Sequence, residues 1–355
     1  MNANLSVAMY PASVSQDDNP FITILGDGLR FNGVVVQPFR PWLRATNADA
    51  LHIHWLEQIF WGRVSSRFPW VQKFLANGIV SAAERFRSAG KPVVWTVHNL
   101  RPHDGMTEAR RTIFSSLVDS FIPLVTDCIV MDESTIELVK SEYPQLSESR
   151  FHLIPHPNFT ATFEAFAPFP SARLNYNVSD SSTLLVSAGK IRSYKGLPEL
   201  VRILREVQAD FTLIIAGDGD EKETASIKKE IGDDERFIFD NRTIPAKEMA
   251  ALLATADAAV FNFTSILNSG SVLSALSVST PVIGPAVGAM IGLAKQVGAP
   301  WVQIHPHPLS PEFLNQSIID VGNVRSSFCN LTDSAPRAVA SRHAEIYRSS
   351  RHADA

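Results

Sequence analysis

Short runs of apolar, often β-branched residues alternate with longer amphipathic stretches along the whole chain of 355 residues. The short runs predict buried strands, and apolar positions three or four residues apart in the longer stretches predict helices. This alternation is typical of parallel sheets with helices on both faces, so the sequence predicts an α/β fold. The expected strands cover residues 5–10, 34–39, 50–55, 92–99, 127–131, 150–155, 183–189, 210–217, 236–241, 258–263 and 280–285.

The same pattern predicts the domain organisation. Amphipathic stretches predict a helix over residues 68–90 and another over the tail 338–349. The first stretch ends on Gly90, a residue that commonly ends helices. A proline-rich and aromatic stretch without a period separates the two series of strands and is interpreted as a linker. We expect a Rossmann-like domain over 1–165, a linker over 166–182, a second Rossmann-like domain over 183–330, and a segment 331–355 whose helix packs back on the first domain.

Composition and charge exclude several classes of protein. Apolar residues make up 45% and charged residues 19% of the chain, as in ordinary globular proteins. The net charge of −4 argues against nucleic acid as a partner. Cys128 and Cys329 form no disulfide or zinc pattern, and no stretch of about 18 apolar residues predicts a membrane span. The first residues show no basic leader, so we expect a cytoplasmic protein.

The strand expected at 183–189 is followed by Lys190, Arg192 and Lys195, and not by the glycine pattern of dinucleotide-binding proteins. Glycine lets the backbone approach a diphosphate, arginine binds two phosphate oxygens at once, and lysine supplies a point charge. We interpret the loop that begins at Gly189 as a candidate diphosphate site. A solvated basic loop is an equally good interpretation of these residues taken alone.

A second candidate segment consists of Asn268, Ser269, Gly270 and Ser271, which precede an expected helix. Free N–H groups and hydroxyls at a helix start bind anions, and the helix dipole adds to the attraction. Taken alone, the segment is better interpreted as a simple helix cap. Two such loops after strands of one sheet shift the interpretation toward a nucleoside diphosphate site.

Asp218 and Asp220 follow the strand expected at 210–217 and form a D-x-D pair. Such a pair holds a divalent metal in some sugar-nucleotide enzymes, because carboxylate oxygens are hard ligands. The flanking Gly217 and Gly219 favour the other interpretation, a tight turn before a charged helix.

The first half of the chain carries histidines near expected strand ends. His52 and His54 are two residues apart on one strand and share a face, a spacing also found in metal-dependent hydrolases. No further ligand set completes a metal site, and buried, hydrogen-bonded histidines are the commoner alternative. We favour a proton acceptor at the carboxyl ends of the strands, with His98, then Asp104, then Glu57 as candidates.

Residues 55–74 mix aromatic side chains with arginines. Such a run can rest on a membrane, with rings at the lipid interface and cations on anionic headgroups. Tryptophan and phenylalanine are also common in protein cores, which is the alternative here. We expect a peripheral contact of this segment with the inner face of the cell membrane.

Four segments of the chain carry a family resemblance: LHIHWLE (51–57), VVWTVHNLRPHD (93–104), GKIRSYKG (189–196) and NSGSVLSALSVSTPVIGP (268–285). In this order they resemble the GT-B glycosyltransferases of bacterial exopolysaccharide assembly. Within that group they are most similar to the xanthan-type GDP-mannose:glycolipid 4-β-D-mannosyltransferase family. The run Asn19, Pro20 and Phe21 also suits the N-terminal loop of this family.

The resemblance implies two Rossmann-like, doubly wound parallel-sheet domains facing a cleft, with the nucleotide-sugar donor on the second domain and the acceptor on the first. It implies transfer of a hexose, mannose from GDP-mannose, to a lipid-linked oligosaccharide in exopolysaccharide biosynthesis, without a metal or other cofactor. Carried over to this chain, the donor-binding residues are Gly189, Lys190, Arg192, Lys195, Asn268, Ser269, Gly270 and Ser271. The catalytic candidates are His98, Asp104 and Glu57.

One departure from the wider group bears on mechanism. Retaining members carry two glutamates eight positions apart, and Ile266 and Ser274 occupy the corresponding positions here. The missing carboxylates favour inversion, in which a base deprotonates the acceptor hydroxyl for direct attack on the anomeric carbon. The alternatives are a retaining transferase or a sugar-nucleotide epimerase that uses a UDP-sugar, and a non-catalytic protein that binds a sugar nucleotide.

Overall fold

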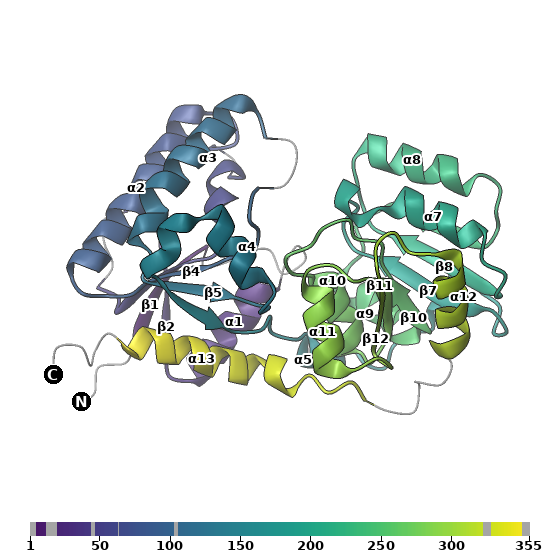
Figure 1. Ribbon diagram of the computed structural model, residues 1–355. Coiled ribbons are helices and arrows are strands. Elements are labelled where there is room, and N and C mark those ends of the chain that lie inside the picture. Colours follow the sequence, from purple (N-terminus) through teal and green to yellow (C-terminus); the bar gives the residue numbers. More distant parts are fainter. Residues whose placement is uncertain are drawn as a thin grey trace. The chain divides into compact units, whose positions relative to one another are not determined.

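The computed structural model describes residues 5–11, 20–43, 47–62, 64–102, 106–321 and 328–349. The chain forms two compact units, each built around its own parallel sheet (Figure 1). The first unit combines Met1–Pro157 with the C-terminal segment Asp333–Ala355, and the second consists of Asn158–Thr332. Asn19 and Asp104, two of the residues singled out in the sequence, lie outside the described residues.

The first unit holds a six-stranded parallel sheet in the order β2-β1-β3-β4-β5-β6. Four of its strands are buried at every position, because helices cover both faces of the sheet. The strands are β1 (Ser6–Tyr10), β2 (Val35–Pro38), β3 (Ala50–Ile53), β4 (Val93–Thr96), β5 (Asp127–Val130) and β6 (Arg150–Leu153). The longer helices are α1 (Phe21–Phe31), α2 (Pro69–Ser88), α3 (Glu108–Phe121), α4 (Thr135–Glu142) and α13 (Pro336–Arg348), and short 3-10 helices are η1 (Leu56–Phe60), η2 (Ile122–Leu124) and η3 (Pro144–Glu148).

The second unit holds another six-stranded parallel sheet, in the order β12-β11-β10-β7-β8-β9. Its strands are β7 (Thr183–Ala188), β8 (Phe211–Ala216), β9 (Phe237–Asp240), β10 (Ala258–Val260), β11 (Val282–Pro285) and β12 (Val302–His305). Its helices are α5 (Thr160–Glu164), α6 (Ala172–Asn175), α7 (Leu197–Arg205), α8 (Glu221–Ile231), α9 (Ala246–Thr255), α10 (Gly270–Ser277), α11 (Ala289–Val297) and α12 (Pro311–Asp320), with the 3-10 helix η4 (Ser193–Lys195). Thr332–Ser334 form a last 3-10 turn, η6, where the second unit ends.

The predicted α/β fold is confirmed, and each of the expected strands is present. The sequence pattern misses β12, which lies at the edge of the second sheet. Only Val302 of this strand is fully buried, and Pro306 follows it directly. An edge strand needs no continuous apolar run, so the pattern gave no signal there.

Residues 158–182 belong to the second unit, although the expected boundaries divide them between the first domain and a linker. Two contacts fix this segment to α9 and the residues after it. The Ala172 N–H donates to Thr255 Oγ1 at 3.1 Å, and the guanidinium of Arg173 forms a short ion pair with Asp257. Phe159, Phe163 and Ala172 of the segment are also buried, so polar and apolar contacts together hold it in the second unit.

Helix α13 packs in the core of the first unit beside α1 (Figure 1). A side chain at Gly28 of α1 would place its Cβ 2.8 Å from Ala340 Cβ, so the two helices approach closely only because residue 28 is glycine. Val339, Ala344 and Tyr347 of α13 are fully buried in the same core. Among the described residues, no helix is long and apolar enough to cross a bilayer.

Candidate functional site

Two glycines bring the carboxyl ends of β7 and β8 together. Gly189 follows β7 with φ +102°, and its N–H donates to the Ala216 carbonyl at 2.9 Å. A Cβ on Gly217, which follows β8, would lie only 2.2 Å from the Gly189 carbonyl oxygen. A side chain at residue 217 would force the two loops apart, and the positive φ of Gly189 favours glycine there, so both glycines are needed for the local shape.

The side chain of Lys195 points back to the end of β7, where the loop that starts at Gly189 begins. Its side chain is only 5% exposed, and Nζ donates to the Ala188 carbonyl at 3.3 Å. Burial, with a smaller contribution from the Arg192 charge, lowers the pKa of Lys195 to about 8. Gly196, at φ +56°, then allows the chain to enter α7, and its carbonyl accepts from Asn262 Nδ2 at 3.1 Å.

The structure brings the two predicted donor-binding segments together at Gly189. A Cβ built on Gly189 would lie 3.1 Å from Ser271 Oγ and 3.3 Å from Lys195 Nζ. Ser271 belongs to the first turn of α10, whose N–H groups carry the positive end of the helix dipole. A buried ammonium, a hydroxyl and a helix start therefore converge on one backbone position, an arrangement that suits a phosphate group.

The other residues of the second segment differ in their surroundings. Ser269 caps α10, since its Oγ accepts from the Val272 N–H at 3.3 Å, as the capping interpretation predicts. Gly270 has open space around its α-carbon, with no atom within 4 Å of an added Cβ. Asn268 is half-buried and engaged with its neighbours.

Lys190 and Arg192 lie on the outer side of the loop. Lys190 Nζ is 3.9 Å from a carboxylate oxygen of Asp218, and both side chains are about half exposed. Arg192 is half-buried, and within the described part of the chain its guanidinium makes no hydrogen bond or ion pair. Arg192 is thus available to an anion.

Asp220 is occupied as a helix cap. Its carboxylate accepts from the Glu223 N–H at 2.9 Å at the start of α8. The Asp218 carbonyl accepts from the Ile191 N–H at 2.8 Å, which ties the loops after β7 and β8 together. These contacts agree with the tight-turn interpretation of the D-x-D pair.

The first unit contains a buried cluster of histidines at the ends of β3 and β4. His52 uses both ring nitrogens: Nδ1 lies 2.6 Å from the Tyr347 hydroxyl, and Nε2 lies 2.7 Å from Thr96 Oγ1. His54 Nδ1 lies 3.1 Å from His98 Nε2. Across the described residues, no three histidine, cysteine or carboxylate side chains group as a metal site would require.

His98 is packed tightly between aromatic rings. Its imidazole stacks on Trp55 with ring centroids 3.9 Å apart, and the Phe21 ring lies almost perpendicular to it with ring centroids 4.8 Å apart. Burial, and then the neighbouring His156, hold the pKa of His98 well below its usual range. The ring is therefore neutral at physiological pH.

Glu57 lies on η1, just after β3, and is half-buried. Asn99 Nδ2, just after β4, donates to Glu57 Oε1 at 3.1 Å. Burial raises the pKa of Glu57 above its usual value, against the opposing hydrogen bonds of the backbone and Asn99. Asn99 directly follows His98, but no sequence pattern predicted a role for it.

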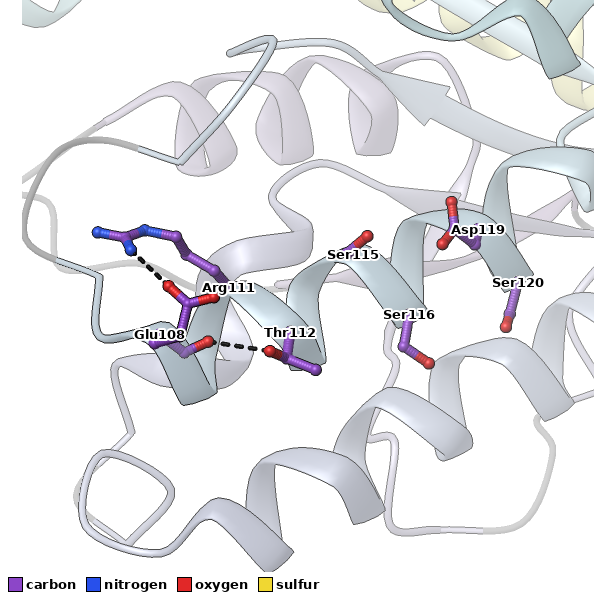
Figure 2. A pocket seen from close by; sticks show the side chains of 7 residues that line it. All are labelled: Glu108, Arg111, Thr112, Ser115, Ser116, Asp119 and Ser120. Carbon is purple, nitrogen blue, oxygen red and sulfur yellow. Dashed lines mark hydrogen bonds and ion pairs between the residues drawn. The ribbon is translucent and has the colours of Figure 1, made fainter.

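Figure 2 shows a shallow depression on the outer face of α3, lined by Glu108, Arg111, Thr112, Ser115, Ser116, Asp119 and Ser120. All seven residues come from one helix, and Glu108 pairs with Arg111 at 2.8 Å. None of the residues predicted for the site lines it, so this depression is a solvated helix face.

Comparison with known proteins now identifies relatives of both units. Residues 182–303 match the family described as Glycosyl transferases group 1. The chain is 25% identical over 311 residues to the GDP-mannose:glycolipid 4-beta-D-mannosyltransferase of Xanthomonas campestris pv. campestris, which covers 85% of this chain and 79% of that protein. The predicted resemblance is confirmed by these matches.

Solved structures share the fold over almost the whole chain. A glycosyltransferase from Rickettsia africae ESF-5 has a TM-score of 0.61 at 12% identity, covering 99% of this chain and 100% of that one. The Anabaena protein HepE in complex with UDP-glucose has a TM-score of 0.58 at 12% identity, covering 98% of each chain. The fold is therefore that of the GT-B glycosyltransferases.

Proposed function

We propose that this chain, a GT-B-fold protein with a glycosyl transferases group 1 domain, transfers mannose from GDP-mannose to a lipid-linked oligosaccharide with inversion. Glycosyl transfer is the activity that the family match and the relatives support. The finer assignment of donor and acceptor draws on the name of the Xanthomonas relative at 25% identity. A role in exopolysaccharide assembly belongs to the same proposal.

The observation that carries the proposal is the convergence of Lys195 Nζ and Ser271 Oγ at Gly189. A departing nucleoside diphosphate gains negative charge on its terminal phosphate oxygen. A fixed ammonium, the hydroxyl and the start of α10 would stabilise that charge, and Arg192 could bind the second phosphate. These groups would take the place of a metal ion, so we propose that transfer is metal-independent.

For the base we favour Glu57 over His98. The Nε2 atom of His98 lies against His54 and its ring is enclosed by Trp55 and Phe21, which leaves little room for an acceptor. Glu57 is half-buried, and Asn99 Nδ2 holds one of its carboxylate oxygens. Its carboxylate would remove the acceptor hydroxyl proton as the oxygen attacks the anomeric carbon, and the bond from that carbon to the diphosphate oxygen would break.

The first test is a thermal-shift panel with GDP, UDP, ADP and their sugar conjugates, with and without EDTA. A ligand at a hundredfold excess over its Kd stabilises the native state by about 2.7 kcal/mol, which is readily measured. We expect GDP and GDP-mannose to stabilise the protein in EDTA, and Arg192→Ala to abolish the effect. Lys228→Ala, on the exposed face of α8, is the matched control.

A product assay tests the reaction itself. Labelled GDP-mannose and a lipid-linked oligosaccharide should yield a β-mannosyl product, assigned by NMR of the anomeric proton. An α-linked product would instead identify a retaining transferase, and preference for UDP-sugars would reject mannose. Binding without any turnover would favour a non-catalytic sugar-nucleotide-binding protein.

A further inference from the structure

The first unit exposes a group of large apolar side chains, which we call the aromatic face. Two of its exposed members, Trp70 (68%) and Phe74 (54%), lie one turn apart on α2. The aromatic face comprises Trp42, Leu43, Trp61, Val64, Phe68, Trp70 and Phe74. By contrast Leu56, Ile59 and Phe60 are buried, so the first part of the expected contact segment 55–74 belongs to the core.

The loop that carries Trp61 is held in place by polar contacts. The guanidinium of Arg110, on α3, lies 5.5 Å from the ring centre of Trp61, and its Nη2 donates to the Ser66 carbonyl at 2.7 Å. Gln72 Nε2, on α2, donates to the Ser65 carbonyl at 2.6 Å. Helices α2 and α3 lie side by side in Figure 1, so the loop is anchored to both. The rings are therefore presented by a fixed scaffold.

A second segment of the chain extends the same face. A Cβ on Gly78 of α2 would lie 1.9 Å from the Pro41 carbonyl oxygen, so the chain before Trp42 crosses α2 at this glycine. Phe74 is one helical turn before Gly78 and shares its side of the helix. The chain that carries Trp42 and Leu43 therefore passes α2 close to the turn that carries Phe74.

The charged side chains of residues 58–83 are all positive. Arg67 and Lys73 are exposed among the rings, and the sequence contains no aspartate or glutamate between Glu57 and Glu84. A positive aromatic surface complements anionic lipid headgroups, with rings at the level of the glycerol backbone. A second copy of the same face would meet it with like charges, which disfavours self-association.

We propose that the aromatic face binds the surface of an anionic phospholipid bilayer. Trp42, Trp61, Trp70 and Phe74 would enter the headgroup region, and Arg67 and Lys73 would contact lipid phosphates. This surface lies entirely within the first unit and does not depend on the proposed glycosyl transfer. Loss of vesicle binding and loss of the proposed glycosyl transfer can therefore be measured separately.

The test is flotation of the full chain with vesicles of phosphatidylcholine alone and of phosphatidylcholine with phosphatidylglycerol. We expect binding to the anionic vesicles that weakens with salt. The double variant W70S/F74S and the double variant R67E/K73E should each lower the vesicle partition coefficient at least about tenfold. The matched controls are L138S/L174S, which removes apolar side chains exposed elsewhere, and K228E/K229E on α8.

Each variant is checked for folding by its thermal transition and by stabilisation with GDP. Unchanged partitioning of both double variants, with the native transition retained, overturns the proposal. It also fails if W70S/F74S instead dissolves a dimer detected by analytical ultracentrifugation, because the aromatic face would then be an interface between copies. If GDP does not stabilise the wild-type chain, the proposed nucleotide site is rejected. The vesicle-binding result is unaffected by that outcome.

Discussion

The Nδ1 atom of His52 lies 2.6 Å from the hydroxyl oxygen of Tyr347, although 295 residues separate them in the chain. Both side chains are fully buried, and the contact joins β3 to the C-terminal helix α13. The other nitrogen of His52 is used by Thr96 on β4. One imidazole thus connects three elements of the first unit, which makes it a stabilising centre of that unit.

We predict that Tyr347→Phe lowers the free energy of unfolding by about 1–3 kcal/mol, because a buried ring nitrogen loses its partner. Thr96→Val should act in the same way on the other nitrogen. The double variant should lose less free energy of unfolding than the two single variants lose together, because both hydroxyls bond to one imidazole. Urea unfolding of the four proteins measures the coupling, and strict additivity would contradict it.

We predict that acid destabilises the first unit through its buried histidines. Burial holds the pKa values of His52, His54 and His98 well below 6.5 and lowers those of His156 and His343 to about 4. The unfolded chain, with ordinary histidines, therefore binds more protons below about pH 6.5. The free energy of unfolding should fall steadily as the pH drops from 6.5 toward 4.

The variant His343→Leu tests this assignment. Its Nδ1 bonds only to the Val339 carbonyl of its own helix, and its buried Nε2 has no hydrogen-bond partner. Removing it should flatten the dependence of unfolding free energy on pH between 6.5 and 4. An identical slope in wild type and variant would show that other groups cause the acid sensitivity.

We predict that Gly189→Ala abolishes nucleotide binding. The residue has φ +102°, and the added methyl group would stand between Lys195 Nζ and Ser271 Oγ, where we place a phosphate. Gly232→Ala is the matched control, since Gly232 also has positive φ but no atom lies within 4 Å of its added Cβ. Both variants should be destabilised by about 1 kcal/mol of backbone strain. Only Gly189→Ala should lose the thermal shift with GDP.

We predict that Lys195→Met binds nucleotide poorly but unfolds at a higher temperature, by roughly 2–4 °C, because it removes a buried charge. Lys190→Met, which changes an exposed lysine, should have little effect on the melting temperature. In the wild type, nucleotide affinity should decline as the pH rises through about 8, where Lys195 loses its proton. Calorimetric titration with GDP between pH 7 and 9 measures this decline. A constant affinity over that range would exclude an ammonium contact.

We predict that Glu57→Gln lowers the rate of the proposed mannosyl transfer at least about a hundredfold while GDP still stabilises the protein. The active form of a base is deprotonated, so kcat should fall as the pH drops through the raised pKa of Glu57. His98→Gln should leave this pH profile in place. If His98→Gln removes the fall of kcat at low pH and Glu57→Gln does not, His98 is the base and Glu57 is not.

The sequence pointed to the two candidate loops of the second unit because their signals are local, and their binding of a donor stays a prediction. A strand, a glycine and closely spaced cations occur within one short segment, and small polar residues precede α10. Parallel strands place their carboxyl ends at the same edge of a sheet, so two such loops meet by topology. The sequence did not show how these lysines differ. Lys195 is buried, whereas the side chain of Lys190 is about half exposed.

By itself the sequence determined the α/β class, the strands with strong apolar runs and the resemblance to GT-B transferases, since each depends on periodicity or on short motifs. Tertiary structure decided which histidines are structural, because the partner of His52 comes from the far end of the chain. It also decided that Asn99 orients Glu57 and that Gly78 lets a distant loop join the aromatic face. Contacts of this kind depend on how elements far apart in the chain pack together, and no local pattern of residues encodes that packing.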